Sequence, residues 1–298
     1  AKKIICASTG NTSASAGMFA ANENMECDVY IPDGQIAPGK LSQAYQFGTQ
    51  MIKVGGNFDD AFTKSLEAAK QAGSYTVNSV NPFRIEGQKT IPFRALEFLN
   101  WDVPDWIVYP GGALGNTSSC GKSLMELYRW GWIKKIPRIA VVNASGANTL
   151  YQLFNGKFND EKLRWNDGSP DLELVREYYN CMNKDEKLKP KTKATAIQIG
   201  KPANLTKGLR ALEYTNGVVI QVSDKEMLDG MSAVGLNGFD CEMASGATVA
   251  GIKKLLDDDI IKKDDKIIGV LTGRQKEPML PIEYHNDPNN RFAIPPKS

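Results

Sequence analysis

The chain of 298 residues carries 36 lysines and arginines against 34 aspartates and glutamates, with hydrophobic residues at 42% and charged residues at 23%. These values are typical of a globular protein with room for two lobes, and a net charge of +2 excludes a strongly basic nucleic-acid-binding surface. No apolar run approaches the length of a membrane span. Five scattered cysteines predict no disulfide framework and no metal site, so a reducing, cytoplasmic location is expected, with a plastid as the alternative.

Strand and helix signals alternate along the first third of the chain. A hydroxyl-rich loop, residues 8–17, joins the first strand to the first helix and exposes free backbone N–H groups at the start of that helix. An anion or a planar polar ring would be held well there, and an ordinary helix N-cap is the alternative interpretation. Strands are expected at residues 4–7, 27–32, 50–54 and 75–77, and helices at 18–21 and 57–70.

The same alternation continues beyond residue 92 and predicts an α/β fold of parallel sheets covered by helices on both faces. We expect a smaller lobe over residues 1–92 and a larger lobe over residues 93–298. The polar segment 154–193 is interpreted as a surface excursion without function. Strands are expected at residues 106–109, 138–142, 195–199, 218–222 and 266–271, and helices at 90–100, 121–130, 204–214, 225–234 and 245–256.

The turn Gly111–Asn116 contains three glycines at places where a backbone can approach a ligand closely. Its N–H groups, with Thr117 and Ser118, would form an anion-binding nest at a helix start, and a simple glycine-rich turn is the alternative. The distance in sequence to Lys122 does not fit a Walker loop. The loops 8–13, 111–119 and 271–274 all follow strands, which predicts one common site at the carboxyl ends of the strands.

Six stretches of the sequence resemble those of the threonine synthase family, whose members are pyridoxal phosphate enzymes of fold-type II, the tryptophan synthase β-like fold. The resemblance covers nearly the whole chain and implies a two-lobed α/β enzyme with a cofactor cleft between the lobes. The stretches are ASTGNTSASAG, Ile31–Pro32 with Gly39–Leu41, NSVNPFRIEGQKT, GGALGN, Ile199–Pro202 leading into Asn204–Leu212, and CEMASGA at 241–247.

The resemblance implies pyridoxal phosphate as the cofactor and assigns residues to it. Asn11 would hydrogen-bond the phenolic oxygen, and Thr272 would face the pyridine nitrogen, leaving it less fully protonated than a carboxylate would. The phosphate would be held by Gly112, Ala113, Leu114, Gly115 and Asn116.

The resemblance implies a reaction that converts O-phospho-L-homoserine and water to L-threonine and phosphate, which would make the protein a carbon–oxygen lyase. Arg84 suits the substrate phosphate because its planar guanidinium binds phosphate in a bidentate manner, and a surface ion pair with Glu86 is the alternative. The residues implied to bind the carboxylate and phosphate of the substrate are Ser8, Thr9, Thr12, Ser79, Asn81 and Arg84.

Two departures from the family pattern affect these expectations. The family's Schiff-base lysine lies roughly two dozen residues before the hydroxyl-rich loop that contains Asn11, so this sequence is expected to start too late to include it, and no catalytic residue is assigned here. The 298-residue chain is therefore expected to bind the cofactor weakly and without turnover. The family's LTG-H segment corresponds to Leu271–Pro278, which lacks the histidine.

Two other functions remain as alternatives. One is another lyase of fold-type II, such as a threonine dehydratase or a cysteine synthase-like enzyme, although neither needs to bind a γ-phosphate. The other is a non-catalytic phosphate-binding α/β protein. The expected partner is a small-molecule substrate, with no nucleic acid, membrane or metal, and a homodimer is the assembly considered.

Overall fold

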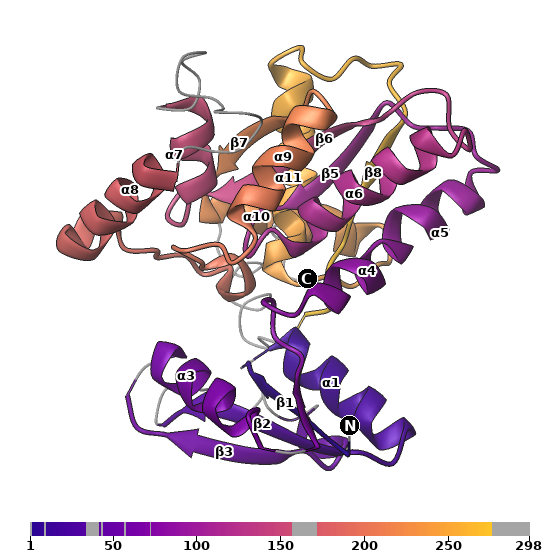
Figure 1. Ribbon diagram of the computed structural model, residues 1–298. Helices are drawn as coiled ribbons and strands as arrows, with labels where there is room; N and C mark the ends of the chain where they lie inside the picture. The colour runs from indigo at the N-terminus through magenta and orange to yellow at the C-terminus, as the bar shows by residue number, and fades with distance from the viewer. Residues whose placement is uncertain are drawn as a thin grey trace, which may run out of the picture. The chain divides into compact units, whose positions relative to one another are not determined.

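The computed structural model describes residues 2–8, 10–33, 44–56, 58–71, 73–156 and 172–275, together with Ser42. The chain forms two compact units that divide between Arg84 and Ile85, and each contains one four-stranded parallel sheet (Figure 1). The division falls inside helix α4 (Pro82–Gln88), and the expected lobe boundary at residue 92 stays a prediction. No helix in the described part of the chain has the length and apolar character needed to cross a membrane.

The sheet of the first unit has the order β3-β2-β1-β4, with every neighbouring pair parallel. Small side chains of α1, Ala16 and Ala20, are buried against Cys6 and Val29 of the sheet. Because β1 and β4 are parallel neighbours, the loops that follow them lie at the same edge. The elements are β1 (Lys3–Ala7), α1 (Asn11–Asn22), β2 (Glu26–Pro32), β3 (Gln50–Val54), α3 (Phe58–Ala68) and β4 (Ser74–Thr76).

Helix α1 begins at Asn11, so the predicted loop over residues 8–17 is wrong from Asn11 onward. The Ser13 hydroxyl donates to the Gly10 carbonyl at 2.7 Å, which consolidates the first turn. Small residues fill the rest of the stretch, and a Cβ on Gly17 would lie only 2.5 Å from Cγ2 of Thr49. The short side chains that suggested a loop instead allow α1 to approach Thr49 closely.

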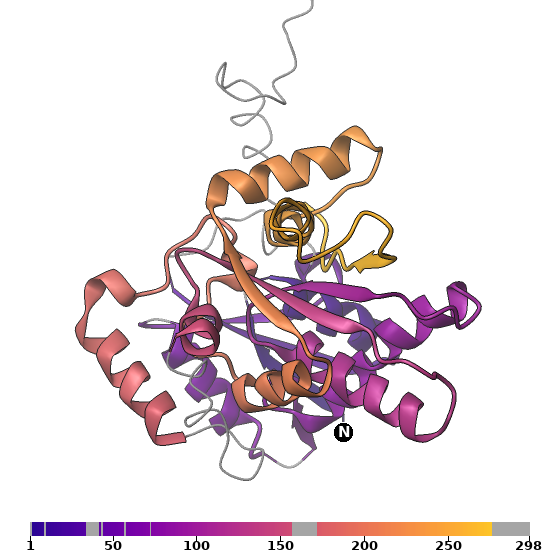
Figure 2. The ribbon, with the colours of Figure 1, turned by 90° about the horizontal axis from the view of Figure 1, so that it is seen from above.

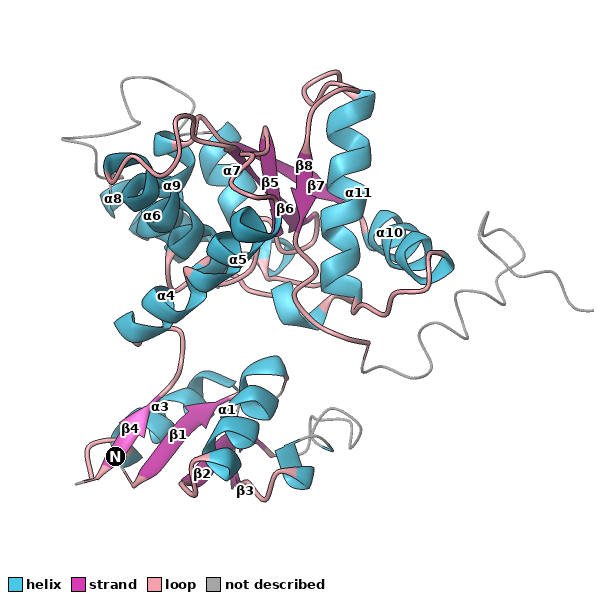
Figure 3. Ribbon diagram, turned by 90° about the vertical axis from the view of Figure 1, so that its right-hand side faces the viewer, coloured by secondary structure: helices cyan, strands magenta, loops and turns pink. Residues whose placement is uncertain are grey.

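The sheet of the second unit has the order β7-β6-β5-β8, and it is also parallel throughout. Helices α10 and α11 lie on one side of this sheet, and α6 and α9 lie on the other (Figures 2 and 3). The elements are α5 (Thr90–Phe98), β5 (Trp106–Pro110), α6 (Gly115–Arg129), β6 (Arg138–Ala144), α7 (Thr149–Asn155), α8 (Leu172–Lys184), the 3₁₀ turns η2 (Glu186–Leu188) and η3 (Thr195–Ile197), α9 (Leu205–Tyr214), β7 (Val218–Val222), α10 (Asp224–Leu236), α11 (Met243–Asp257) and β8 (Ile267–Gly269).

Alternate side chains of the central strands enter two separate cores. Val108 and Val142 pack toward α10 and α11, whereas Tyr109 and Val141 pack toward α6 and α9. All four side chains are at most 1% exposed. Burial on both faces explains why these strands appear in the sequence as continuous apolar runs, as parallel sheets covered on both sides require.

Two predicted elements of this unit differ from the structure. The strand expected at residues 195–199 is wrong, because Thr195–Ile197 forms the 3₁₀ turn η3. Within residues 195–199 only Ile197 is buried, so the stretch lacks the alternating burial of a strand. Helix α6 begins at Gly115 instead of Gly121, so the last glycine of the GGALGN stretch is already helical.

Helices α10 and α11 cross at a pair of glycines. A Cβ on Gly230 would lie 2.2 Å from the Gly246 carbonyl oxygen and 3.1 Å from the Ala250 nitrogen. Both neighbours are backbone atoms of α11, so the contact cannot be relieved by a side-chain rotation. The crossing therefore fixes the start of α11 against the sheet.

We expect Gly230→Ala to lower the free energy of unfolding by about 1–3 kcal/mol, because the added methyl group forces the two helices apart. Gly235→Ala in the same helix is the control, since a Cβ there would meet no atom within 4 Å. That variant should gain up to about 1 kcal/mol from its helix propensity. Urea denaturation of both variants tests the pair, and equal stabilities would contradict the close crossing.

Candidate functional site

A short loop, residues 111–114, connects the carboxyl end of β5 to the start of α6. Leu114 has a φ of 64°, which a bulky residue rarely adopts. The Leu114 side chain is only 3% exposed, and a Cβ on Gly208 would lie 3.2 Å from it. The packing of Leu114 against α9 thus offsets the strain of a backbone turn that directs the loop into the helix.

The backbone N–H groups of residues 112–117 have no hydrogen-bond acceptor within the described part of the chain, whereas the Ser118 N–H donates to the Leu114 carbonyl at 3.0 Å. The Thr117 hydroxyl is buried and lacks a partner among the described residues, and so does the side-chain oxygen of Gln88. That oxygen would lie 3.0 Å from a Cβ on Gly115. The Gln88 oxygen is an acceptor, whereas the unpaired N–H groups and the Thr117 hydroxyl are donors at a helix start and form a cradle that fits a phosphate group.

Two buried asparagines hold the loop in place. Asn143 donates to the Gly111 carbonyl at 2.9 Å and accepts the Tyr151 N–H at 2.9 Å. The Asn204 N–H donates to the Ala113 carbonyl at 3.1 Å. These bonds use the carbonyl groups of the loop and leave its N–H groups for a ligand.

Sheet register brings Thr272 beside this loop. Strand β8 pairs with β5 up to Gly269 opposite Val108, and the Val270 N–H continues the pairing by donating to the Val108 carbonyl at 3.0 Å. Thr272 therefore follows β8 at the level where Gly111 follows β5. Its backbone N–H donates to the Ser245 hydroxyl oxygen at 2.8 Å, which ties Thr272 to the first turn of α11.

The predicted residues of the first unit gather at the carboxyl edge of β1 and β4. Asn78 makes two bonds with the backbone of Ala7, accepting its N–H at 2.9 Å and donating to its carbonyl at 2.7 Å. This pairing fixes the end of β1 directly before the loop that leads to Asn11. Ser8, half-buried, accepts the Gly10 N–H at 3.2 Å, and Asn11 and Thr12 open α1.

Arg84 is half-buried, and it donates from Nη1 to the Ser79 hydroxyl at 3.1 Å. Burial lowers the pKa of the guanidinium, with a smaller opposite effect from Cys6, but leaves it charged at neutral pH. No carboxylate among the described residues pairs with it; Glu86 instead pairs with Lys89 and Lys122, so the alternative of an Arg84–Glu86 pair is wrong. A desolvated cation without a counter-ion favours an anionic ligand.

Asn81 is used within the fold. Its amide nitrogen donates to the Thr76 carbonyl at 2.7 Å, and its oxygen accepts the Phe83 N–H at 2.9 Å. Asn81 therefore shapes the start of α4 and so holds Arg84. Its role as a direct substrate ligand stays a prediction.

Thr9, the Gly39–Leu41 part of the IP…GKL motif and residues 276–278 lie outside the described residues. The structure brings Ser8, Asn11, Thr12, Ser79 and Arg84 together in the first unit, and Gly112–Asn116 with Thr272 in the second. That the two groups share one cleft stays a prediction. No role is predicted from the sequence for Gln88, Asn143, Glu242 or Ser245, although three of these four lie in the quoted family stretches.

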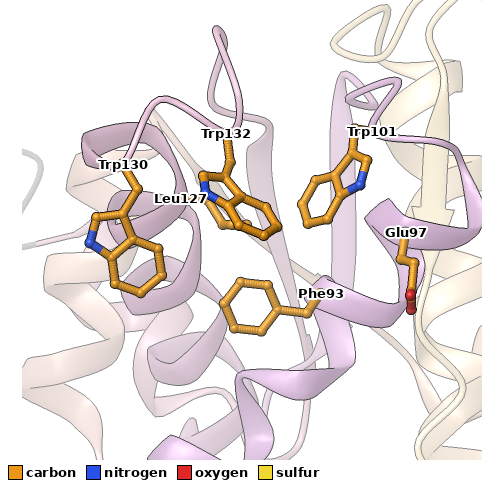
Figure 4. Close-up of a pocket in the computed structure, with 6 residues that line it drawn as sticks. All are labelled: Phe93, Glu97, Trp101, Leu127, Trp130 and Trp132. Atoms are coloured by element: carbon orange, nitrogen blue, oxygen red, sulfur yellow. The ribbon is translucent and has the colours of Figure 1, made fainter.

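A separate hollow of about 310 Å³ lies at the other end of α6 (Figure 4). Trp101 and Trp132 form an edge-to-face pair there, with ring centroids 5.0 Å apart. The hollow is lined mostly by apolar and aromatic surface, with one carboxylate and no Lys or Arg, so it does not fit a phosphate. Its lining residues are Phe93, Glu97, Trp101, Leu127, Trp130 and Trp132.

Residues 1–273 match the family described as pyridoxal-phosphate dependent enzyme. The threonine synthase of Methanocaldococcus jannaschii is 37% identical over 285 residues, which cover 95% of this chain and 65% of the relative. The threonine synthase of Bacillus sp. (strain ULM1) is 37% identical over 281 residues, covering 94% of this chain and 70% of the relative. The chain thus spans about two thirds of the length of these curated relatives.

Solved structures share the fold at low sequence identity. A fungal L-serine ammonia-lyase from Rhizomucor miehei superimposes with a TM-score of 0.70 at 17% identity, covering 96% of this chain and 82% of that one. Maize serine racemase gives a TM-score of 0.67 at 17% identity, covering 93% and 74%. These likenesses confirm the predicted α/β fold of fold-type II and are evidence for the fold alone.

We expect Thr117→Val to separate binding from stability. The variant removes a buried hydroxyl that no described group satisfies, so the free energy of unfolding should stay constant or rise by about 1 kcal/mol. If the hydroxyl serves a bound phosphate group, the affinity for pyridoxal phosphate should fall roughly three- to tenfold. Urea denaturation and equilibrium dialysis measure the two effects.

Thr215→Val is the matched control, because the Thr215 hydroxyl is buried and donates to the Ala211 carbonyl at 2.9 Å, at the far end of α9. It should lose about 1 kcal/mol of stability and keep its affinity. Destabilisation by Thr117→Val with unchanged affinity would contradict the assignment of this hydroxyl to the cradle.

Proposed function

We propose that this chain, which belongs to the family of pyridoxal-phosphate dependent enzymes, is part of a threonine synthase. The proposed enzyme converts O-phospho-L-homoserine and water to L-threonine and phosphate. Family membership confirms the predicted cofactor, pyridoxal phosphate, and supports a small-molecule substrate. The specific substrate, the lyase reaction of the whole protein and a homodimeric, cytoplasmic state belong to the proposal. Two features of the structure support the proposal: the unpaired N–H groups at the start of α6 and the guanidinium of Arg84.

The cradle at the start of α6 fits the phosphate of the cofactor. The N–H groups of Gly112–Asn116 would donate to its oxygens, and the positive end of the helix dipole would favour its charge. Adjacent Thr272 would meet the ring nitrogen, and Asn11 would meet the phenolic oxygen. When bound, pyridoxal phosphate supplies an electron sink for the electrons left when a proton is removed beside the substrate's amino group.

Arg84 is the observation that carries the choice of substrate. Its half-buried guanidinium has the Ser79 hydroxyl beside it and no carboxylate among the described residues. A phosphate group on the substrate would supply the missing negative charge through two parallel N–H···O bonds. The substrate of a threonine dehydratase has no phosphate, so in that alternative only its single carboxylate could pair with the half-buried guanidinium.

We expect Arg84→Leu to lower kcat/KM for O-phospho-L-homoserine at least about a hundredfold, because a bidentate contact to a dianion is lost, equivalent to about 2.7 kcal/mol. Arg84→Lys should recover part of the loss, since an ammonium keeps the charge but not the planar fork. Phosphate release and threonine formation are measured with the protein expressed from its complete natural gene.

Arg94→Leu is the control, because Arg94 is exposed and pairs only with Glu97 among the described residues. It should keep full kcat/KM for O-phospho-L-homoserine. The proposal would be wrong if Arg84→Leu retained full kcat/KM. Deamination of L-threonine without any turnover of O-phospho-L-homoserine would also exclude it and favour the dehydratase.

A further inference from the structure

The side-chain amide of Gln88, the last residue of α4, packs on the first residue of α6. A Cβ on Gly115 would lie 3.0 Å from Oε1 of Gln88 and 3.7 Å from its Nε2, so the missing side chain of Gly115 provides the space that the amide occupies. Oε1 is buried and accepts no hydrogen bond from a described residue. Nε2 likewise donates to none of the described residues. The fold as described therefore makes no use of this amide.

A second polar side chain at the same helix start is in the same condition. The Thr117 hydroxyl, in a residue that is 1% exposed, has no partner in the described part of the chain. Buried polar groups without a partner are rare in native proteins, and two of them lie here beside the unpaired backbone N–H groups of the cradle. Their common position indicates a bound group that completes the hydrogen bonds of all of them.

Ion pairs hold the end of α4 against α6 and so fix the backbone that carries Gln88. Lys122 of α6 pairs with Glu86 of α4, and Lys89, the next residue after Gln88, lies 2.5 Å from Glu126 of α6. Lys122 and Glu126 are one helical turn apart, so both pairs form on one side of α6. With the backbone held in this way, the torsions of the Gln88 side chain decide which atom reaches the cradle.

The amide can present either of its two polar atoms. A half turn about the last side-chain torsion exchanges Oε1 and Nε2 in nearly the same volume, and this torsion is broad and two-fold. The positive end of α6 attracts Oε1, which is the atom nearer to Gly115. A phosphate dianion at the cradle would attract Nε2 instead, because Nε2 donates hydrogen bonds and Oε1 only accepts them.

We propose that Gln88 is a ligand of the cofactor's phosphate, and that its amide turns to donate an Nε2–H to a phosphate oxygen. This inference rests on the proposed cofactor site and adds to the cradle a side chain for which no role is predicted from the sequence. It also explains the glycine at position 115, since a side chain there would displace the amide. Unlike the backbone N–H groups, this donor can be removed by substitution.

The test uses pyridoxine 5′-phosphate, which carries the phosphate but has no aldehyde to react with lysines. Gln88→Met keeps the length of the side chain and removes both polar atoms, so the affinity of the 298-residue chain should fall about three- to tenfold. Gln88→Glu should lower it more, at least about tenfold, because a carboxylate cannot donate and repels the phosphate. Isothermal titration calorimetry measures both effects.

Gln152→Glu is the matched control, because it adds the same charge at an exposed position of α7. It should keep the wild-type affinity. Urea denaturation checks the fold of Gln88→Met, which should be at least as stable as the wild type because a buried acceptor without a donor is removed. Unchanged affinity in Gln88→Met would overturn the inference and assign Oε1 to an ordered water. Unchanged affinity in Gln88→Glu would overturn the donor role.

A second measurement follows the amide itself. The two N–H signals of Gln88 in a ¹H–¹⁵N spectrum are identified by their loss in Gln88→Met. Pyridoxine 5′-phosphate should move one of them strongly downfield, whereas pyridoxine, which lacks the phosphate, should leave both in place. No such shift at saturation would overturn the inference and leave the proposed function intact. Failure of the phosphate ester to bind the wild-type chain would overturn the proposed cofactor site and this inference with it.

Discussion

The second unit depends on keeping a run of backbone N–H groups unpaired at the edge of its sheet. Leu114 turns the chain with a positive φ, and Asn143 and Asn204 bond the carbonyl groups of the loop instead of its N–H groups. An unpaired buried donor is unfavourable, so these interactions maintain a state that a bound anion would stabilise. The packing of α9 and of the sheet is what makes the cradle persist.

The two units offer anions different chemistry. The second unit presents peptide dipoles and a hydroxyl, which suit a phosphate that stays in place because they are rigid and carry no mobile counter-ion. The first unit presents the guanidinium of Arg84 on a short helix beside a loop. A guanidinium with a hydroxyl beside it would suit a phosphate that enters and leaves. This division of roles accords with the proposed resident cofactor and the proposed exchanging substrate.

The sequence predicted the alternation of strands and helices well, because burial on both faces leaves apolar runs such as Trp106–Tyr109 that have no other explanation. It failed where small residues served packing, as at Gly17, and where only Ile197 is buried within an apparent strand. Asn143 and Gln88 could not be assigned, since their surroundings are set by strand register and by the packing of α4 against α6. Those relations exist only in three dimensions.

The pairing of β8 with β5 has a consequence for biosynthesis. The Lys266 N–H bonds Asp105 across 161 residues of sequence, at the point where the two strands begin to pair. Until β8 has been synthesised, the edge of the apolar strand β5 that faces β8 has no strand partner, although its other edge can pair with β6. Such an edge can pair with other nascent chains, and distant pairing slows folding. The emerging chain therefore passes through a stage in which a chaperone that shields β5 would raise the yield of folded protein.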